Sequence, residues 1–78
     1  MENIEVAKIF EEVADLLEIQ GANPFRVRAY RTAARTIGSL STPVESMLKD
    51  GGHRLEELPG IGADLAEKID RICRTGEL

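Results

Sequence analysis

Leu58-Pro59-Gly60-Ile61-Gly62 interrupts a sequence that otherwise has the apolar spacing of helices. Pro59 disfavours helical backbone at Leu58, so a helix that precedes it ends here. Gly60 and Gly62 permit positive φ angles and a close approach of the backbone to a neighbour. The stretch therefore predicts a tight hairpin between two helices.

The segment that follows the hairpin has apolar residues at helical spacing. They are Leu65, Ala66, Ile69, Ile72 and Cys73. The first amides of a helix lack an intrahelical acceptor, so we expect them to point outward together with the hairpin amides and to attract a phosphate oxygen. The expected phosphate-binding amides are those of Gly60, Ile61, Gly62 and Ala63. The alternative is an ordinary corner between two helices of a small bundle.

The composition limits what the chain can be. Its 78 residues suit one domain with a modest core, and its single cysteine, Cys73, allows no internal disulfide. We expect Cys73 to be a buried hydrophobe. The chain has neither an apolar run of membrane-spanning length nor the pattern of a signal peptide, so we expect a cytoplasmic protein without membrane contact and, by default, a monomer.

Charge is unevenly distributed along the chain, whose net charge is −4. Residues 1–20 hold six acidic residues and one lysine, whereas residues 21–40 hold four arginines and no acid. A net negative domain is unusual for strong nucleic-acid binding. The arginine segment is nevertheless a candidate contact with a polyanion, and the alternative is that the acidic and basic helices attract each other or are solvated.

Apolar spacing predicts a first helix over about residues 3–19 and a second that begins at Pro24, with Asn23 as N-cap, and ends near Ile37 or Gly38. The core face expected for the first helix is Val6, Ile9, Phe10, Val13, Leu16 and Leu17. The core face expected for the second is Phe25, Ala29, Tyr30, Ala33, Ala34 and Ile37. Arg28, Arg31 and Arg35 fall on the opposite side, where we expect a solvated stripe.

Three further features complete the expected helices. Thr42, Pro43 and Glu45 have the pattern of a capping box that opens a short helix, and Gly51-Gly52 stops that helix. About one helical turn over residues 53–57 then precedes the hairpin, and the last helix ends near residues 75–76. The expected fold is therefore all-α, a compact bundle of about four helices.

Arg26 projects from the apolar side of the second predicted helix, one turn before Tyr30. A cation on this side either extends from the helix end to water or holds a ligand anion beside the tyrosine hydroxyl. The residues alone leave both interpretations open.

Two segments together resemble a known family. The run from Asn23-Pro24-Phe25-Arg26 through Ala34-Arg35-Thr36-Ile37, followed some twenty residues later by Leu58-Pro59-Gly60-Ile61-Gly62 and Ala66-Glu67-Lys68-Ile69, is similar to the amino-terminal 8-kDa domain of family X DNA polymerases, especially the bacterial and archaeal ones. The resemblance covers nearly the whole chain. It implies a helix-hairpin-helix domain that binds gapped or nicked DNA near a 5′-phosphate during base excision repair.

The resemblance also carries expectations for individual residues and partners. Residues 1–78 would be one domain excised from a larger polymerase, whose later domains would be its partners and would alone use Mg²⁺. DNA contacts would come from Gly60, Ile61, Gly62, Ala63, Arg26, Tyr30 and Lys68. The backbone carbonyls of Leu58 and Ile61 would match a Na⁺ or K⁺ site in the hairpin, and no other cofactor is implied.

Lys68 matches the lysine that forms a Schiff base in members with 5′-deoxyribose-phosphate lyase activity. Such a lysine attacks as the neutral amine, but Asp64 lies four residues earlier and favours an ion pair. Asp64 and Glu56 also stand where the family's phosphate pocket has lysines, and Phe25 stands in place of a histidine. Glu67 matches an acid that could assist proton transfer.

Three functional interpretations therefore stay open. The chain is a DNA-binding domain, a lyase that acts through Lys68, or a structural module whose acidic first helix docks on the remaining polymerase.

Overall fold

The structure, a computed structural model, describes residues 1–49 and 53–76. Within these ranges every element is helical: α1 (Asn3–Ile19), α2 (Pro24–Ser39), the 3-10 helix η1 (Val44–Leu48), α3 (His53–Glu56) and α4 (Ala63–Thr75). The all-α bundle expected from the sequence is confirmed. The Gly51-Gly52 stop lies outside the described residues.

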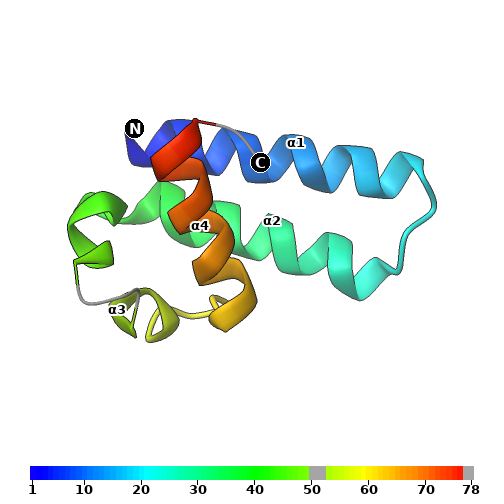
Figure 1. Ribbon diagram of the computed structural model, residues 1–78. Coiled ribbons are helices and arrows are strands. Elements are labelled where there is room, and N and C mark those ends of the chain that lie inside the picture. The colour runs from blue at the N-terminus through cyan, green and yellow to red at the C-terminus, as the bar shows by residue number, and fades with distance from the viewer. Residues whose placement is uncertain (50–52, 77–78) are drawn as a thin grey trace.

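α1 and α2 form an antiparallel pair along the long axis of a molecule that measures 35 × 22 × 19 Å (Figure 1). The turn between them uses Gly21 at φ 74°, a left-handed conformation that glycine adopts without strain. The Asn23 side chain then accepts a hydrogen bond from the Phe25 amide at 2.8 Å, and Pro24 is the first residue of α2. Both predicted start signals of α2 are confirmed, although the helix continues to Ser39.

The hydrophobic core lies between the α1–α2 pair and α4, with two side chains from η1 (Val44 and Met47) and one each from α3 (Leu55) and the hairpin (Ile61). Phe10 and Tyr30 meet inside it edge to face, with ring centroids 5.5 Å apart. The fully buried large side chains are Val6, Phe10, Ile37, Val44, Leu55, Ile69 and Ile72. Each element thus contributes at least one side chain to one continuous core.

Two residues assigned to the core from their spacing lie outside it. Leu16 is 58% exposed and Phe25 is 75% exposed. Leu16 belongs to the last turn of α1 and Phe25 to the first turn of α2. α4 does not reach this end of the α1–α2 pair (Figure 1). Helical spacing places a residue on a face, but burial also needs a neighbouring element over that part of the face.

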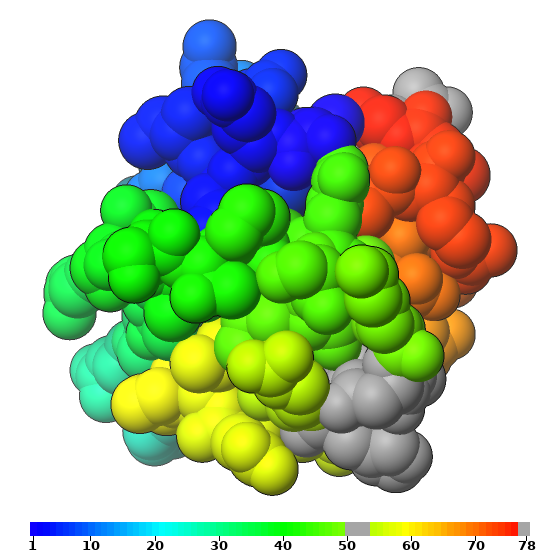
Figure 2. Space-filling view, turned by 90° about the vertical axis from the view of Figure 1, so that its left-hand side faces the viewer, coloured from blue at the N-terminus to red at the C-terminus, as the bar shows by residue number. Residues whose placement is uncertain are grey.

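The predicted capping box at Thr42 is wrong. Pro43, rather than Thr42, holds the N-cap position of η1, and no side chain of η1 caps it. Asn3 of α1 does so instead: its Oδ1 accepts from the Val44 amide and its Nδ2 donates to the Thr42 carbonyl, both at 2.8 Å. η1 is therefore fixed to the start of α1, as the face in Figure 2 shows.

α4 crosses the α1–α2 pair, and the hairpin before it lies beside α3 (Figure 1). α4 ends where predicted, at Gly76, whose φ of 80° is left-handed and whose amide donates to the Ile72 carbonyl. Here the end of α4 lies near the chain start, as Figure 2 also shows. No helix in residues 1–49 and 53–76 has the length and apolar character needed to cross a membrane.

Candidate nucleic-acid interface

The hairpin is a short, closed turn anchored in the core. The Leu58 amide donates to the Leu55 carbonyl at 3.0 Å, and the Ile61 amide donates to the Leu58 carbonyl at 3.1 Å. The side chain of Ile61 is 3% exposed and so fixes the turn to the bundle. The backbone outside this anchor is held in one conformation while it faces solvent.

Gly60 has to be glycine for two reasons. Its φ of 78° lies in the left-handed region, and a Cβ added to it would approach Thr32 Cγ2 to 2.8 Å, closer than carbon atoms pack. A second contact joins the same elements, because Thr36 Oγ1 donates to the Pro59 carbonyl at 3.1 Å. The hairpin is therefore clamped against α2 by two threonines one turn apart.

Gly62 does not adopt the positive φ that the sequence suggested. Its φ of −90° and ψ of −177° are extended, because one left-handed residue, Gly60, completes the turn. A Cβ on Gly62 would meet nothing within 4 Å. Neither backbone conformation nor packing within the described chain requires glycine at this position, but the missing side chain leaves the neighbouring amides uncovered.

α4 begins without a side-chain cap, unlike the two other long helices. At the start of α1 Glu5 Oε1 accepts from the Glu2 amide, and at the start of α2 Asn23 Oδ1 accepts from the Phe25 amide, whereas Gly62 has no side chain to offer. Around the hairpin and the first turn of α4, five amides of the described residues have no acceptor, and we call them the hairpin amides. They are those of Gly60, Gly62, Ala63, Asp64 and Leu65.

The hairpin amides differ from the predicted set at Ile61. Its amide closes the turn onto Leu58, so it is engaged within the protein. Asp64 and Leu65 extend the set instead, because no cap takes up the amides of the first turn of α4. The outcome is a cluster of donors at the positive end of a 13-residue helix.

Arg26 and Tyr30, the two side chains expected to hold an anion, differ in exposure. Arg26 is exposed, and after Lys68 its charge also helps to lower the pKa of Asp64 in the first turn of α4. Tyr30 is 3% exposed and its ring belongs to the core. The Tyr30 hydroxyl forms no hydrogen bond with the described residues. Because none of their fully buried polar side-chain atoms lacks a partner, this hydroxyl is in contact with solvent.

Lys68 forms the ion pair that its spacing from Asp64 predicted. Its Nζ lies 2.8 Å from Asp64 Oδ1, and the side chains are 24% and 78% exposed, respectively. The hydrogen bond from Lys68 and then its charge hold the pKa of Asp64 below its usual range. The first turn of α4 thus presents free amides together with a carboxylate already neutralised by Lys68.

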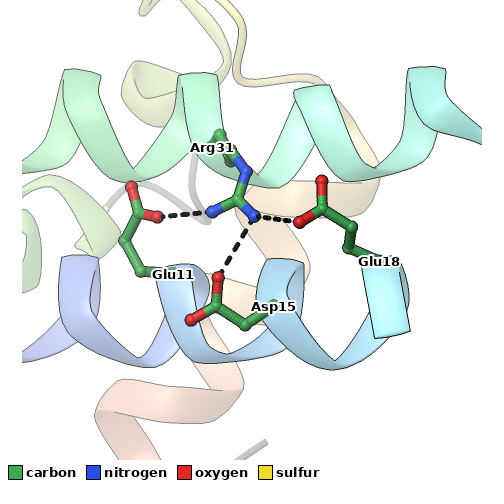
Figure 3. A network of polar contacts seen from close by, with 4 residues as sticks. All are labelled: Glu11, Asp15, Glu18 and Arg31. Carbon is green, nitrogen blue, oxygen red and sulfur yellow. Dashed lines mark hydrogen bonds and ion pairs between the residues drawn. The ribbon is translucent and has the colours of Figure 1, made fainter. Parts of the chain in front are cut away.

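The expected solvated stripe of three arginines is wrong for its central member. Arg31 points toward α1 and meets Glu11 at 3.0 Å, Asp15 at 3.1 Å and Glu18 at 3.4 Å, as Figure 3 shows. The predicted attraction between an acidic and a basic helix therefore exists, but it is concentrated on one guanidinium. Arg28 and Arg35 have no carboxylate at ion-pair distance among the described residues.

The hairpin carbonyls suggested for a monovalent cation are not equivalent. The carbonyl of Leu58 accepts from the Ile61 amide and keeps one lone pair, while that of Ile61 accepts from no described residue. Two carbonyl oxygens are ligands suited to Na⁺ or K⁺ but are too few alone, so a nucleic-acid oxygen or water would have to complete the shell. Among the described residues, no group of three or more His, Cys, Asp or Glu side chains could hold a metal ion.

Sequence reasoning missed the two threonines that hold the hairpin and the partners of Arg31. Thr32 and Thr36 lie more than twenty residues from the hairpin, and nothing in their local pattern distinguishes them from ordinary helix residues. These contacts depend on how α2 and the hairpin pack, which local spacing does not specify.

A turn clamped to a helix, one obligatory left-handed glycine and uncapped amides at the start of the next helix are the features expected of a helix-hairpin-helix element. Comparison with protein families agrees over the full length of the chain. The family described as "Helix-hairpin-helix domain" matches residues 1–78. The chain therefore belongs to the helix-hairpin-helix domain family.

Proposed function

We propose that this domain binds DNA for a family X DNA polymerase, holding gapped or nicked DNA through backbone phosphates during repair. The observation that carries the proposal is the set of hairpin amides without acceptors, beside the exposed Arg26 and the ion-paired Lys68. Membership of the helix-hairpin-helix family supports nucleic-acid binding in general. The similarity of the Asn23–Ile37 segment to family X polymerases supports the narrower assignment.

The proposed mechanism is positional. A phosphate oxygen placed before α4 would accept hydrogen bonds from the Gly62 and Ala63 amides and gain from the positive end of the helix. Backbone amides carry no sequence preference, so the contact would fix the position of a strand without reading bases. Arg26 and the Tyr30 hydroxyl would face a terminal 5′-phosphate, and a Na⁺ or K⁺ at the Leu58 and Ile61 carbonyls would add a bridge to the same strand.

Binding by the isolated domain should be weak and salt-dependent. With about three phosphates contacted, the logarithm of the association constant should fall against the logarithm of salt concentration with a slope of roughly −2 to −3. The acidic α1 adds no favourable contact. The remaining polymerase domains would supply the rest of the affinity.

A second candidate function, the lyase, is favoured by the position of Lys68, which is 24% exposed in the first turns of α4, beside the hairpin. The neutral lysine amine would add to the sugar aldehyde, and the carbinolamine so formed would lose water to give the Schiff base. Against this, Lys68 is held in an ion pair, and an amine in that state is not nucleophilic. Borohydride trapping on a pre-incised abasic substrate tests the activity, with Lys68→Ala as control; no trapped adduct would exclude it.

An amide NMR titration with a one-nucleotide-gapped duplex tests the DNA-binding proposal. We expect shifts centred on the hairpin amides, and shifts at Arg26, Tyr30 and Lys68 that need a 5′-phosphate rather than a 5′-hydroxyl. Gly62→Val is the matched control, because its extended backbone and open surroundings allow the fold while a branched side chain would cover the amides. If no amide moves even at low salt, the domain is a structural module that docks on other domains.

A further inference from the structure

The exposed face of α2 beside the hairpin carries two arginines that no carboxylate of the described residues neutralises. Arg28, Thr32 and Arg35 line one open depression on this helix, and we call them the arginine strip. Thr32 is the residue against which Gly60 packs. The arginine strip is therefore continuous with the hairpin, and its two cations stand about one helical turn to either side of the hairpin contact.

Carboxylates of α1 border the arginine strip on one side. On the side toward α1, the carboxylates of Glu11, Asp15 and Glu18 surround Arg31, which leaves that side with an excess of negative charge (Figure 3). Arg28 and Arg35 lie between these carboxylates and the hairpin: both line the depression with Thr32 and Glu18, and Arg35 also lines a second depression with Lys8 and Glu11 of α1. Arg28 lies over the Phe25 ring at 5.7 Å from its centroid. A polyanion on this face of α2 thus meets two arginines without a carboxylate partner, and the carboxylates around Arg31 repel it on the side toward α1.

We propose that the arginine strip binds the phosphates that flank the one held by the hairpin, on the same DNA strand. The proposal rests on the proposed function and extends it from one phosphate to a path. Arg28 and Arg35 are seven residues apart, which is roughly 10 Å along a helix at 1.5 Å per residue. At about 3.4 Å of rise per nucleotide of one strand, this length corresponds to about three nucleotides, with the hairpin phosphate between the arginines.

Arg31 has no direct part in this path. It lies between Arg28 and Arg35 in sequence, but its guanidinium is occupied by α1. One of its partners, Glu18, lines the same depression as the arginine strip.

Fluorescence anisotropy with a one-nucleotide-gapped duplex tests the proposal at about 50 and 200 mM salt, a range over which phosphate contacts weaken strongly. The variant Arg28→Gln with Arg35→Gln removes two charges from the arginine strip. Arg74→Glu is the matched control, because it changes the net charge equally on an exposed side chain, 3.2 Å from Asp70 on α4, away from Lys68. Urea denaturation of each variant checks that the fold is kept.

Loss of two phosphate contacts should make the slope of log association constant against log salt concentration shallower by about 1.4 to 1.8. The ratio of the wild-type association constant to that of the double variant should therefore fall roughly tenfold between the two salt concentrations. The control should keep the wild-type slope. A double variant with the wild-type slope and affinity overturns the path while the hairpin function stands, provided that Gly62→Val still abolishes binding. A wild-type domain that does not bind at all overturns both.

Discussion

The contact between the hairpin and α2 makes a quantitative prediction about Gly60. In Gly60→Ala, the new Cβ adopts a left-handed backbone, which is expected to cost about 1–2 kcal/mol. It also approaches Thr32 Cγ2 to 2.8 Å. Because a β-branched side chain in a helix has few alternative rotamers, relief requires the hairpin to move, at about 1–3 kcal/mol. We expect a total of roughly 2–5 kcal/mol, a large part of the stability of so small a domain.

A double-mutant cycle separates the two terms. Thr32→Ser removes the Cγ2 methyl, and the next atom, Thr32 Cβ, lies 3.7 Å from the position that the alanine Cβ would take, which is ordinary contact. In the serine background, Gly60→Ala should therefore cost only the left-handed term of about 1–2 kcal/mol. The difference, a coupling of about 1–3 kcal/mol, reports the packing of the hairpin on α2.

Urea denaturation followed by helical circular dichroism measures all four proteins, provided that their m-values agree. If Gly60→Ala is equally destabilising with threonine or serine at position 32, the hairpin does not rest on α2 as described. The clamp would then be absent, and with it the argument that the arginine strip continues from the hairpin.

Four further results are expected. Asn3→Ala, which removes both hydrogen bonds to the η1 segment, should cost about 1–2 kcal/mol in the same assay, and Asn3→Asp less. Arg31→Gln should lower stability at low salt and much less at high salt, because it leaves three carboxylates of α1 facing one another. Lys68 lowers the pKa of Asp64 in the folded protein, so the stability that this pair contributes is present above the pKa of the unfolded Asp64 and is lost as pH falls through the pKa of the folded one. Lys68→Ala should therefore raise the pH midpoint of the Asp64 carboxyl in an NMR titration. Burial raises the pKa of the Cys73 thiol in the folded protein, so its contribution to stability is present below the pKa of the unfolded thiol and is lost as pH rises through the pKa of the folded one. A thiol reagent at about pH 8 should therefore react more slowly with the folded protein than with urea-unfolded protein.

The features that the sequence predicted well are those set by neighbours along the chain. Asn23 and Pro24 start α2 because a side-chain acceptor and a fixed φ act on the next few residues. The Asp64–Lys68 pair forms because residues four apart share a helix face. The left-handed Gly60 follows from the turn that Pro59 begins.

The predictions that failed concern contacts between elements. Thr42 has the local pattern of a cap, but Asn3 from α1 reaches the free amide of η1 first because the two segments pack together. Phe25 has the spacing of a core residue, but no described element buries that end of α2. Arg31 differs from Arg28 and Arg35 only through the acidic residues that α1 places beside it.

Net charge is a poor guide to what this surface binds. At physiological salt, charges interact appreciably over only about 8 Å, whereas the molecule is 35 Å long, so a ligand senses local groups rather than the total of −4. The acidic residues nearest to α2 are gathered around Arg31 on its α1 side. The arginine strip lies between these carboxylates and the hairpin, and at the start of α4 Asp64 is already paired with Lys68. An acidic domain can therefore offer a phosphate one favourable face, and that same acidity would confine the strand to it.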